Sequence, residues 1–311
     1  MITLAALAEL AGRYPDDLAT RVAPLQIGDR MVDTDQRPTL MGVVNLSRDS
    51  SYRDSIAVST DSAVRKAKVQ SAAGADLIDV GAESTRATAA RADLAEQQAL
   101  LTPVIEQLTA AGIAVSVEAY QEPVARAGLA AGARVLNLTG SDDDDRMFTL
   151  AAEHDATVVL CHVLGPNARA LTEDAVDTDP VPGMLDTFGS RIERARQLGV
   201  PSLAVDPGLG FGFHLDDQRV RARHQAAALL HTFRLRRLGV PVCHALPHAF
   251  DIFEDQYRSG EGFFAVLAHL GGTGVYRTHE VSLVRSVLDA MRSFGTGDGT
   301  GPAEDGRGPI T

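Results

Sequence analysis

The sequence predicts an α/β protein with the (β/α)8 architecture of a TIM barrel, a short N-terminal helix and hairpin, and a disordered C-terminal tail. Eight short apolar runs alternate with helix-like stretches, and each run ends in or close to a polar residue. In such a barrel the strand bodies fill the core, and the carboxyl ends of the strands carry the active site. Functional side chains are therefore expected at the polar strand ends.

An N-terminal extension, residues 1–37, precedes the barrel. It contains the helix-like stretch LAALAELAG and then LQIGDRMVDT, which is typical of a hairpin that turns at Gly28 and Asp29. We expect this hairpin to cover the bottom of the barrel.

The barrel itself is predicted to span residues 38–294. Its strands, in order, are LMGVVN ending at Asn45, DLIDVG followed by Glu83, AVSVE ending at Glu118, RVLNLT containing Asn137, VVLCH ending at His162, LAVDPG containing Asp206, PVCHALPH reaching His248, and VYRTHE containing Arg277 and His279. Stretches between them, such as LAEQQALLTPVIEQLTAAG, are amphipathic and end at glycine, as helices commonly do. Residues 295–311 have almost no apolar content and are predicted to be disordered.

The composition excludes several classes of protein. A net charge of −12 and a pI near 5.2 argue against nucleic-acid binding, which needs a basic surface. No apolar run reaches the roughly 18 residues of a membrane span, and the N-terminus lacks the basic region of a secretory signal. We therefore expect a cytoplasmic protein with no nucleic-acid or membrane partner. Cys161 and Cys243 lie within predicted strands and are expected to be small core residues.

Four side chains at neighbouring strand ends suit an anionic, phosphorylated substrate. They are Asn45, Arg86, Arg277 and His279. The first and last strands of a closed barrel are neighbours, so these ends converge. Arginine binds phosphate through paired hydrogen bonds, and an asparagine can orient phosphate or a bound metal ion. The alternative for Arg277 and His279 is a surface ion pair with Glu280 or Glu83.

A second set of polar residues follows the third, fourth and sixth strands, namely Glu118, Asn137 and Asp206. Buried carboxylates and an amide without countercharges suit the edge of a polar heterocycle that carries several N–H groups. The alternative is that each is a structural residue at a strand end. Asp206 opens the segment DPGLGFG, in which glycines allow close approach to a ligand and Phe211 can cover an aromatic ring.

These motifs together resemble dihydropteroate synthase. The resemblance rests on MGVVNLSRDS from Met41, IDVGAESTR from Ile78, VDPGLGFG from Val205 and RTHE from Arg277, in the family's order and spacing across the whole barrel. The chain is identified as a divergent member of that family, within the pterin-binding superfamily. The resemblance implies a homodimeric enzyme of folate biosynthesis. In its reaction a pterin methyl diphosphate loses magnesium-bound pyrophosphate, and p-aminobenzoate attacks the exposed carbocation.

The resemblance also implies roles for individual residues. Asn45 matches the family's magnesium and pyrophosphate residue, and Arg86, Arg277 and His279 match its anion-binding groups. The expected catalytic set is completed by Asp206, which matches a pterin contact. The expected substrate-binding set comprises Asp49, Thr85, Glu118, Asn137, His162, Phe211 and His248. Within this set Asn137 matches a pterin contact, whereas Glu118 replaces an aspartate.

The chain departs from the family at its seventh strand. Where the family has Gly-Met-Ser-Arg-Lys, residues 245–249 read Ala-Leu-Pro-His-Ala, so the lysine that contacts the pterin and the serine that holds p-aminobenzoate are missing. No other lysine can replace it, because Lys66 and Lys68, the only two, lie after the first strand. His248 takes roughly the position of the missing lysine, and its alternative, like that of His162, is a structural role.

Three functions remain open. The first is a transferase that keeps magnesium-assisted loss of pyrophosphate from a pterin-like methyl diphosphate but uses a different nucleophile, because the anion end matches the family and the nucleophile end does not. The second is a non-catalytic pterin-binding paralogue, or a partner of an authentic dihydropteroate synthase. The third, a pterin-binding methyltransferase for a corrinoid partner, is disfavoured by Arg86, Arg277 and His279, which a methyl donor does not need.

Overall fold

The structure is a computed structural model that describes residues 1–47, 56–57, 59–83, 92–141, 143–163, 165, 167, 179–209 and 217–294. Four of the predicted site residues lie outside the described residues: Asp49, Thr85, Arg86 and Phe211. The predicted tail, residues 295–311, also lies outside them.

Eight parallel strands form the barrel that the sequence predicts. They are β3 (Thr39–Asn45), β4 (Leu77–Gly81), β5 (Val115–Ala119), β6 (Val135–Leu138), β7 (Thr157–Cys161), β8 (Leu203–Asp206), β9 (Cys243–Ala245) and β10 (Val275–Thr278). Their order in the sheet is β8-β7-β6-β5-β4-β3-β10-β9. A parallel bridge between Val205 and Val242 joins β8 to the start of β9, so the sheet closes on itself. The prediction of a (β/α)8 barrel is confirmed.

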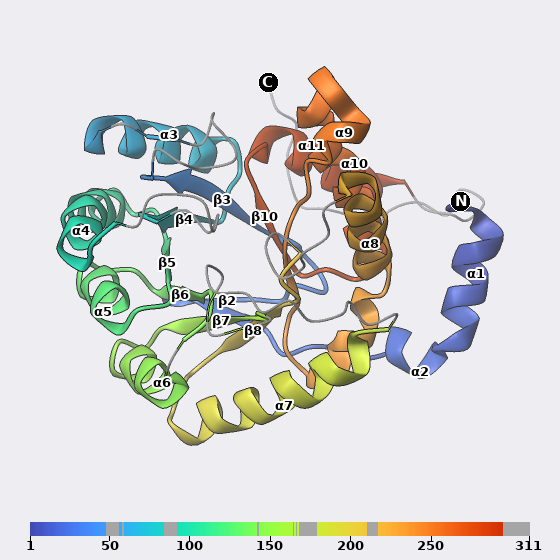
Figure 1. The fold of residues 1–311 in the computed structure, drawn as a ribbon, viewed down its shortest axis with the longest axis horizontal. Helices are drawn as coiled ribbons and strands as arrows, with labels where there is room; N and C mark the ends of the chain where they lie inside the picture. Colours follow the sequence, from blue (N-terminus) through green and yellow to red (C-terminus); the bar gives the residue numbers. More distant parts are fainter. Residues whose placement is uncertain are drawn as a thin grey trace.

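Helices surround this sheet (Figure 1). Those that follow barrel strands are α3 (Thr60–Ala72), α4 (Leu94–Ala110), α5 (Glu122–Ala130), α6 (Asp144–Glu153), α7 (Val181–Gln197), α8 (Gln218–Leu230), α9 (Phe250–Phe253), α10 (Tyr257–Leu270) and α11 (Val281–Ser293), with the 3-10 segments η2 (Thr232–Leu238) and η3 (Glu254–Gln256). None of the helices within the described part of the chain is long and apolar enough to span a membrane.

The N-terminal elements cover one end of the barrel. Helices α1 (Leu4–Arg13) and α2 (Pro15–Leu18) precede an antiparallel hairpin of β1 (Leu25–Ile27) and β2 (Arg30–Val32), which turns at Gly28 with a positive φ of 58°. Leu25 and Ile27 are buried among the apolar residues of the barrel interior. Thr157, the first residue of β7, donates its hydroxyl to the carbonyl of Gln26 at 2.6 Å. The hairpin therefore covers the amino ends of the strands, as predicted.

The barrel interior changes from apolar to polar along the strands. Its amino-end part is an apolar cluster that includes Met41, Leu77, Val135, Val159 and Val275. Alternate residues of a barrel strand face the interior. The residue two positions after each of these apolar side chains therefore faces inward as well, closer to the carboxyl ends. This carboxyl-end opening is called the barrel mouth below.

Candidate active site

The polar part of the interior follows from the alternation within each strand. In β4, Leu77 belongs to the interior cluster, so Asp79 faces the same interior and Gly81 follows it at the barrel mouth. In β5, Val115 and Val117 belong to the outer core beneath the helices, which places Ser116 and Glu118 inside. The same parity places polar residues of β6, β8 and β10 in the interior, namely Asn137, Asp206 and Arg277.

A buried carboxylate joins most of these residues. Asp79 is fully buried and accepts hydrogen bonds from Ser116 Oγ at 2.7 Å, from Asn137 Nδ2 at 3.0 Å and from Arg277 Nε at 2.7 Å. These residues, together with Glu118, are called the Asp79 network. A buried carboxylate is stable only when its oxygens are paired in this way. Asp79 therefore sets the positions of polar side chains from three other strands, β5, β6 and β10.

Glu118 has a countercharge, contrary to the expectation from the sequence. Its Oε2 lies 2.6 Å from Arg277 Nη2, so one guanidinium joins Glu118 and Asp79 through two of its nitrogens. The acidic partners of Arg277 are therefore interior residues of β4 and β5, not the predicted alternatives Glu280 and Glu83. The sequence could not show this pairing, because the guanidinium reaches across β3 to both strands.

Two carboxyl groups of the barrel mouth have raised pKa values. Burial raises the pKa of Glu118 to about 7 against the opposing effect of Arg277, and the nearby charges of Asp79 and Asp206 raise it further. Burial also raises the pKa of Asp206 to about 6, although its Oδ1 accepts a hydrogen bond from Gly208 N at 2.7 Å. Both groups therefore change protonation near neutral pH and can either accept or donate a hydrogen bond.

Asn137 and Asn45 lie at different depths of the mouth. Asn137 is buried, and its Oδ1 accepts a weak hydrogen bond from the thiol of Cys161 at 3.4 Å. Cys161 and Cys243 are both buried free cysteines, which confirms their prediction as core residues.

Asn45 is the last residue of β3, is half-buried, and pairs in register with Gly81. Its place at the carboxyl end of β3 agrees with a position beside a ligand of the mouth.

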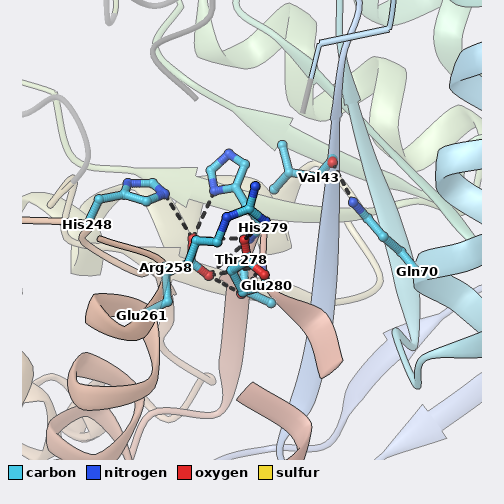
Figure 2. A network of polar contacts seen from close by, with 8 residues as sticks. All are labelled: Val43, Gln70, His248, Arg258, Glu261, Thr278, His279 and Glu280. Carbon is cyan, nitrogen blue, oxygen red and sulfur yellow. Dashed lines mark hydrogen bonds and ion pairs between the residues drawn. The ribbon is translucent and has the colours of Figure 1, made fainter. Parts of the chain in front are cut away.

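Arg277 and His279 are close in sequence but contact different groups. His279 follows β10, and its Nδ1 lies 3.0 Å from Oε1 of Glu261, a fully buried residue of α10. His248 Nε2 lies 3.0 Å from the same oxygen (Figure 2). Burial lowers the pKa of His279, against the opposing effect of Glu261, which favours a neutral ring. A neutral ring lacks the charge that the predicted anion-binding role of His279 would use.

His162 is the predicted site residue that the structure separates from the others. Cys161 before it faces the interior, so His162 lies at the opposite parity, and its ring packs edge-on against Phe188 of α7 at 6.0 Å. Burial, followed by the charge of Arg191, lowers its pKa. These contacts agree with the structural alternative.

Sequence reasoning missed two carboxylates. Asp79 lies in the middle of β4, whereas the sequence pattern singles out strand ends; its position two residues after the inward-facing Leu77 is the feature that marks it as inward-facing. Glu261 lies in α10, in the apolar stretch GEGFFAVLA, where a single acid needs buried partners. Its partners come from β10 and from the segment after β9, and the sequence alone does not bring these together.

Comparison with known proteins identifies relatives across most of the chain. A family described as pterin binding enzyme matches residues 41–279. The dihydropteroate synthase of Mycobacterium leprae is 30% identical over 278 residues, covering 85% of this chain and 94% of that protein. The dihydropteroate synthase of Synechocystis is 28% identical over 276 residues, covering 85% and 92%.

Solved structures agree with these relatives. The dihydropteroate synthase of Thermus thermophilus in complex with 4-aminobenzoate superposes with a TM-score of 0.71 at 31% identity, covering 86% of this chain and 98% of that one. The same enzyme in complex with 6HMPPP gives a TM-score of 0.68 at 29% identity, with the same coverage. The similarity therefore extends over the barrel.

Proposed function

This chain belongs to the pterin binding enzyme family, and on that premise we propose that it is a transferase of the dihydropteroate synthase type that uses a nucleophile other than p-aminobenzoate. The observation that carries the proposal is the set of polar groups lining the barrel mouth, Glu118, Asn137 and Asp206, the first two of which belong to the Asp79 network. Such groups suit a flat heterocycle with N–H donors and ring nitrogens.

The raised pKa values support binding of a pterin-like ring. An ionised Glu118 or Asp206 accepts a hydrogen bond from a ring N–H, and positive charge that develops on the ring stabilises the ionised forms. In the proposed reaction the carbon–oxygen bond to the diphosphate breaks, and the diphosphate leaves with the electron pair. The nucleophile then supplies the pair for the new bond and loses its proton. The acids of the mouth stabilise the cation between these two steps.

Magnesium remains part of this proposal. An amide oxygen is a suitable ligand for Mg²⁺, which commonly takes one or two protein oxygens and fills its other positions with water and substrate phosphates. Asn45 Oδ1 would hold the ion, and Gly81 beside it places no side chain between Asn45 and Glu118. When bound, the ion would neutralise charge on the leaving diphosphate. The homodimer implied by the resemblance also remains a prediction.

The different nucleophile is inferred from the segment after β9. It contains no lysine, and His248 in this segment is paired with Glu261. The loss of a charged and a hydroxyl contact is expected to weaken transfer to p-aminobenzoate by a thousandfold or more. The same observation favours the second candidate, a pterin-binding paralogue without catalytic activity that partners a dihydropteroate synthase.

Calorimetric titration with hydroxymethyl-dihydropterin diphosphate and Mg²⁺, followed by product assays with p-aminobenzoate and with other amines, tests the proposal. We expect binding, little product from p-aminobenzoate, and faster product formation from another amine. Efficient transfer to p-aminobenzoate would overturn the altered nucleophile, whereas absence of binding would overturn the pterin substrate. Binding without product from any amine would favour the paralogue.

One matched pair of variants tests the site itself. Arg277→Ala should lower binding of the diphosphate at least a hundredfold, because it leaves Asp79 and Glu118 without their positively charged partner in the mouth. Arg194→Ala removes an arginine that pairs with Asp145 at the surface, and it should bind like the unmodified chain. Circular dichroism of both variants checks that they are folded.

A further inference from the structure

A second polar centre lies beside the barrel mouth and joins three elements (Figure 2). It consists of Glu261 from α10, His248 from the segment after β9, and Thr278 and His279 from the end of β10; we call it the Glu261 cluster. One ring nitrogen from each histidine and one oxygen of Glu261 lie within 4.8 Å of one another. Two imidazoles and a carboxylate are the ligand set of many zinc and non-haem iron sites.

Glu261 is fully buried and faces polar groups from two other segments. Its Oε1 lies 3.0 Å from His248 Nε2 and 3.0 Å from His279 Nδ1. The backbone N–H groups of His279 and Glu280 also donate to it, at 3.1 and 3.2 Å from Oε2. The hydroxyl of Thr278 donates to the same oxygen. These hydroxyl and backbone donors stabilise the charged form of the carboxylate.

None of these donors supplies a permanent positive charge. Thr278 supplies a hydroxyl, and His279 and Glu280 supply backbone N–H groups. Arg258, drawn beside the cluster, is paired with Glu280 at 3.1 Å (Figure 2). Arg277 is paired with the acids of the Asp79 network. Among the described residues, the carboxylate of Glu261 therefore has no arginine partner, in contrast to Asp79.

The spacing of the cluster fits a small divalent ion. Zinc binds histidine nitrogen and carboxylate oxygen at about 2.0–2.2 Å, so two ligand atoms in tetrahedral geometry lie about 3.3 Å apart. Both histidine nitrogens are now 3.0 Å from Glu261 Oε1. All three ligand atoms lie within 4.8 Å of one another, so side-chain adjustments bring them into the range of one ion. The ring of His248 is stacked on Phe250 at 5.3 Å, which fixes its orientation.

We propose that His248, Glu261 and His279 form a binding site for a divalent transition metal of the zinc class, with Thr278 and the backbone holding the carboxylate in place. On binding, each ring keeps one proton, which moves to its other nitrogen, and the metal takes the vacated lone pair. The three ligands carry a total charge of −1, so the occupied site carries +1. Mg²⁺ does not suit this site, since it prefers oxygen ligands.

This site goes beyond the proposed function and does not depend on it. Its position is nevertheless informative, because the family's lysine is missing from the same segment, around His248. An occupied site would return one positive charge to that side of the barrel mouth. The remaining coordination positions suit water or an anionic oxygen of a ligand.

Titration of the untagged full chain with Zn²⁺, in competition with a chromophoric chelator, tests the site. We expect one ion per chain with a dissociation constant of micromolar or below. His248→Ala, Glu261→Gln and His279→Ala should each weaken binding at least a hundredfold. His269→Ala is the matched control, since it removes a histidine from the last turn of the same helix, α10, and should leave the affinity unchanged.

A second measurement needs no variant. Co²⁺ added to the unmodified chain should give the intense visible absorption of a four- or five-coordinate ion, and Zn²⁺ should abolish it by displacement. An octahedral, weakly absorbing Co²⁺ spectrum, or equal Zn²⁺ affinity in the unmodified chain and folded ligand variants, would overturn the proposal. Neither readout uses the pterin diphosphate, so failure of this site and failure of the proposed function are distinguishable.

Discussion

The Asp79 network and the Glu261 cluster each surround one fully buried carboxylate with several donors, but they differ in charge. Asp79 is paired with the permanent charge of Arg277, which also binds Glu118. Glu261 accepts hydrogen bonds from the Thr278 hydroxyl and two backbone N–H groups and contacts His279 Nδ1, and its Oε1 lies 3.0 Å from His248 Nε2. The comparison teaches that a buried acid paired with arginine has a permanent countercharge, whereas one surrounded by imidazoles, a hydroxyl and backbone N–H groups lies among atoms that can share a cation with it.

The largest effect is expected when the Asp79 network is disrupted. Asp79→Ala leaves Arg277 with one partner and removes the acceptor of Ser116 and Asn137, so the free energy of unfolding in urea should fall by about 3–5 kcal/mol. Asp145→Ala is the control, because this aspartate pairs with Arg194 at the surface, where solvent screens the pair and the loss should be small. Equal losses in the two variants would show that Asp79 does not organise the interior.

The next effect is the pH dependence of stability. Because the pKa of Glu118 is raised from 4.5 to about 7 in the folded chain, the folded state keeps a proton that the unfolded state releases between these pH values. The free energy of unfolding should therefore decrease as pH rises through this window, by roughly 3 kcal/mol, and level off above it. Asp206, with a pKa raised to about 6, acts in the same direction.

Urea unfolding at several pH values between 5 and 8 measures this slope. Glu118→Gln should remove most of it, whereas Glu106→Gln, on the exposed face of α4, should retain it. Glu261 does not contribute in this window. Its pKa is lowered, so its contribution is complete above pH 4.5 and is lost only as pH falls further. An unchanged slope in Glu118→Gln would contradict the assignment to Glu118.

The smallest expected effect distinguishes the Glu261 cluster from the Asp79 network. Thr278→Val and Ser116→Ala each remove one hydroxyl donor, from Glu261 and from Asp79 respectively. Groups that orient a metal ligand commonly change affinity by 10–100-fold. Thr278→Val should therefore weaken Zn²⁺ binding about tenfold, and Ser116→Ala should not change it. The chelator competition described above measures both, and equal losses would indicate a general loss of structure instead.

The strands and the hairpin could be predicted from the sequence because they follow local patterns. Short apolar runs with polar ends, spaced by amphipathic stretches, occur at all eight barrel strands, and LQIGDRMVDT forms the hairpin that turns at Gly28. The inward positions of Asn137 and Asp206 follow from the same patterns. The contacts within the site do not follow from these patterns, because the acids that Arg277 contacts depend on how the strands are arranged in space.

The alternation of side chains within a strand explains two differences between the predicted and the observed site. His162 ends an apolar run, but its ring lies on the outer side against Phe188, because Cys161 before it takes the inward position. Asp79 lies in mid-strand and faces inward two residues after Leu77. Glu261 is a different case, since its role depends on the packing of α10 against β10, which no local pattern of residues contains.

The hairpin at the amino end affects where ligands can enter and leave the barrel. Leu25 and Ile27 fill that end of the barrel interior together with the apolar cluster of the strands, so in the described part of the chain the amino end is closed by apolar side chains. A molecule bound among Glu118, Asn137 and Asp206 is therefore expected to enter and leave through the barrel mouth. For the proposed transfer, the diphosphate released first and the larger product formed second share that exit. The order in which they depart then determines when the next substrate can enter.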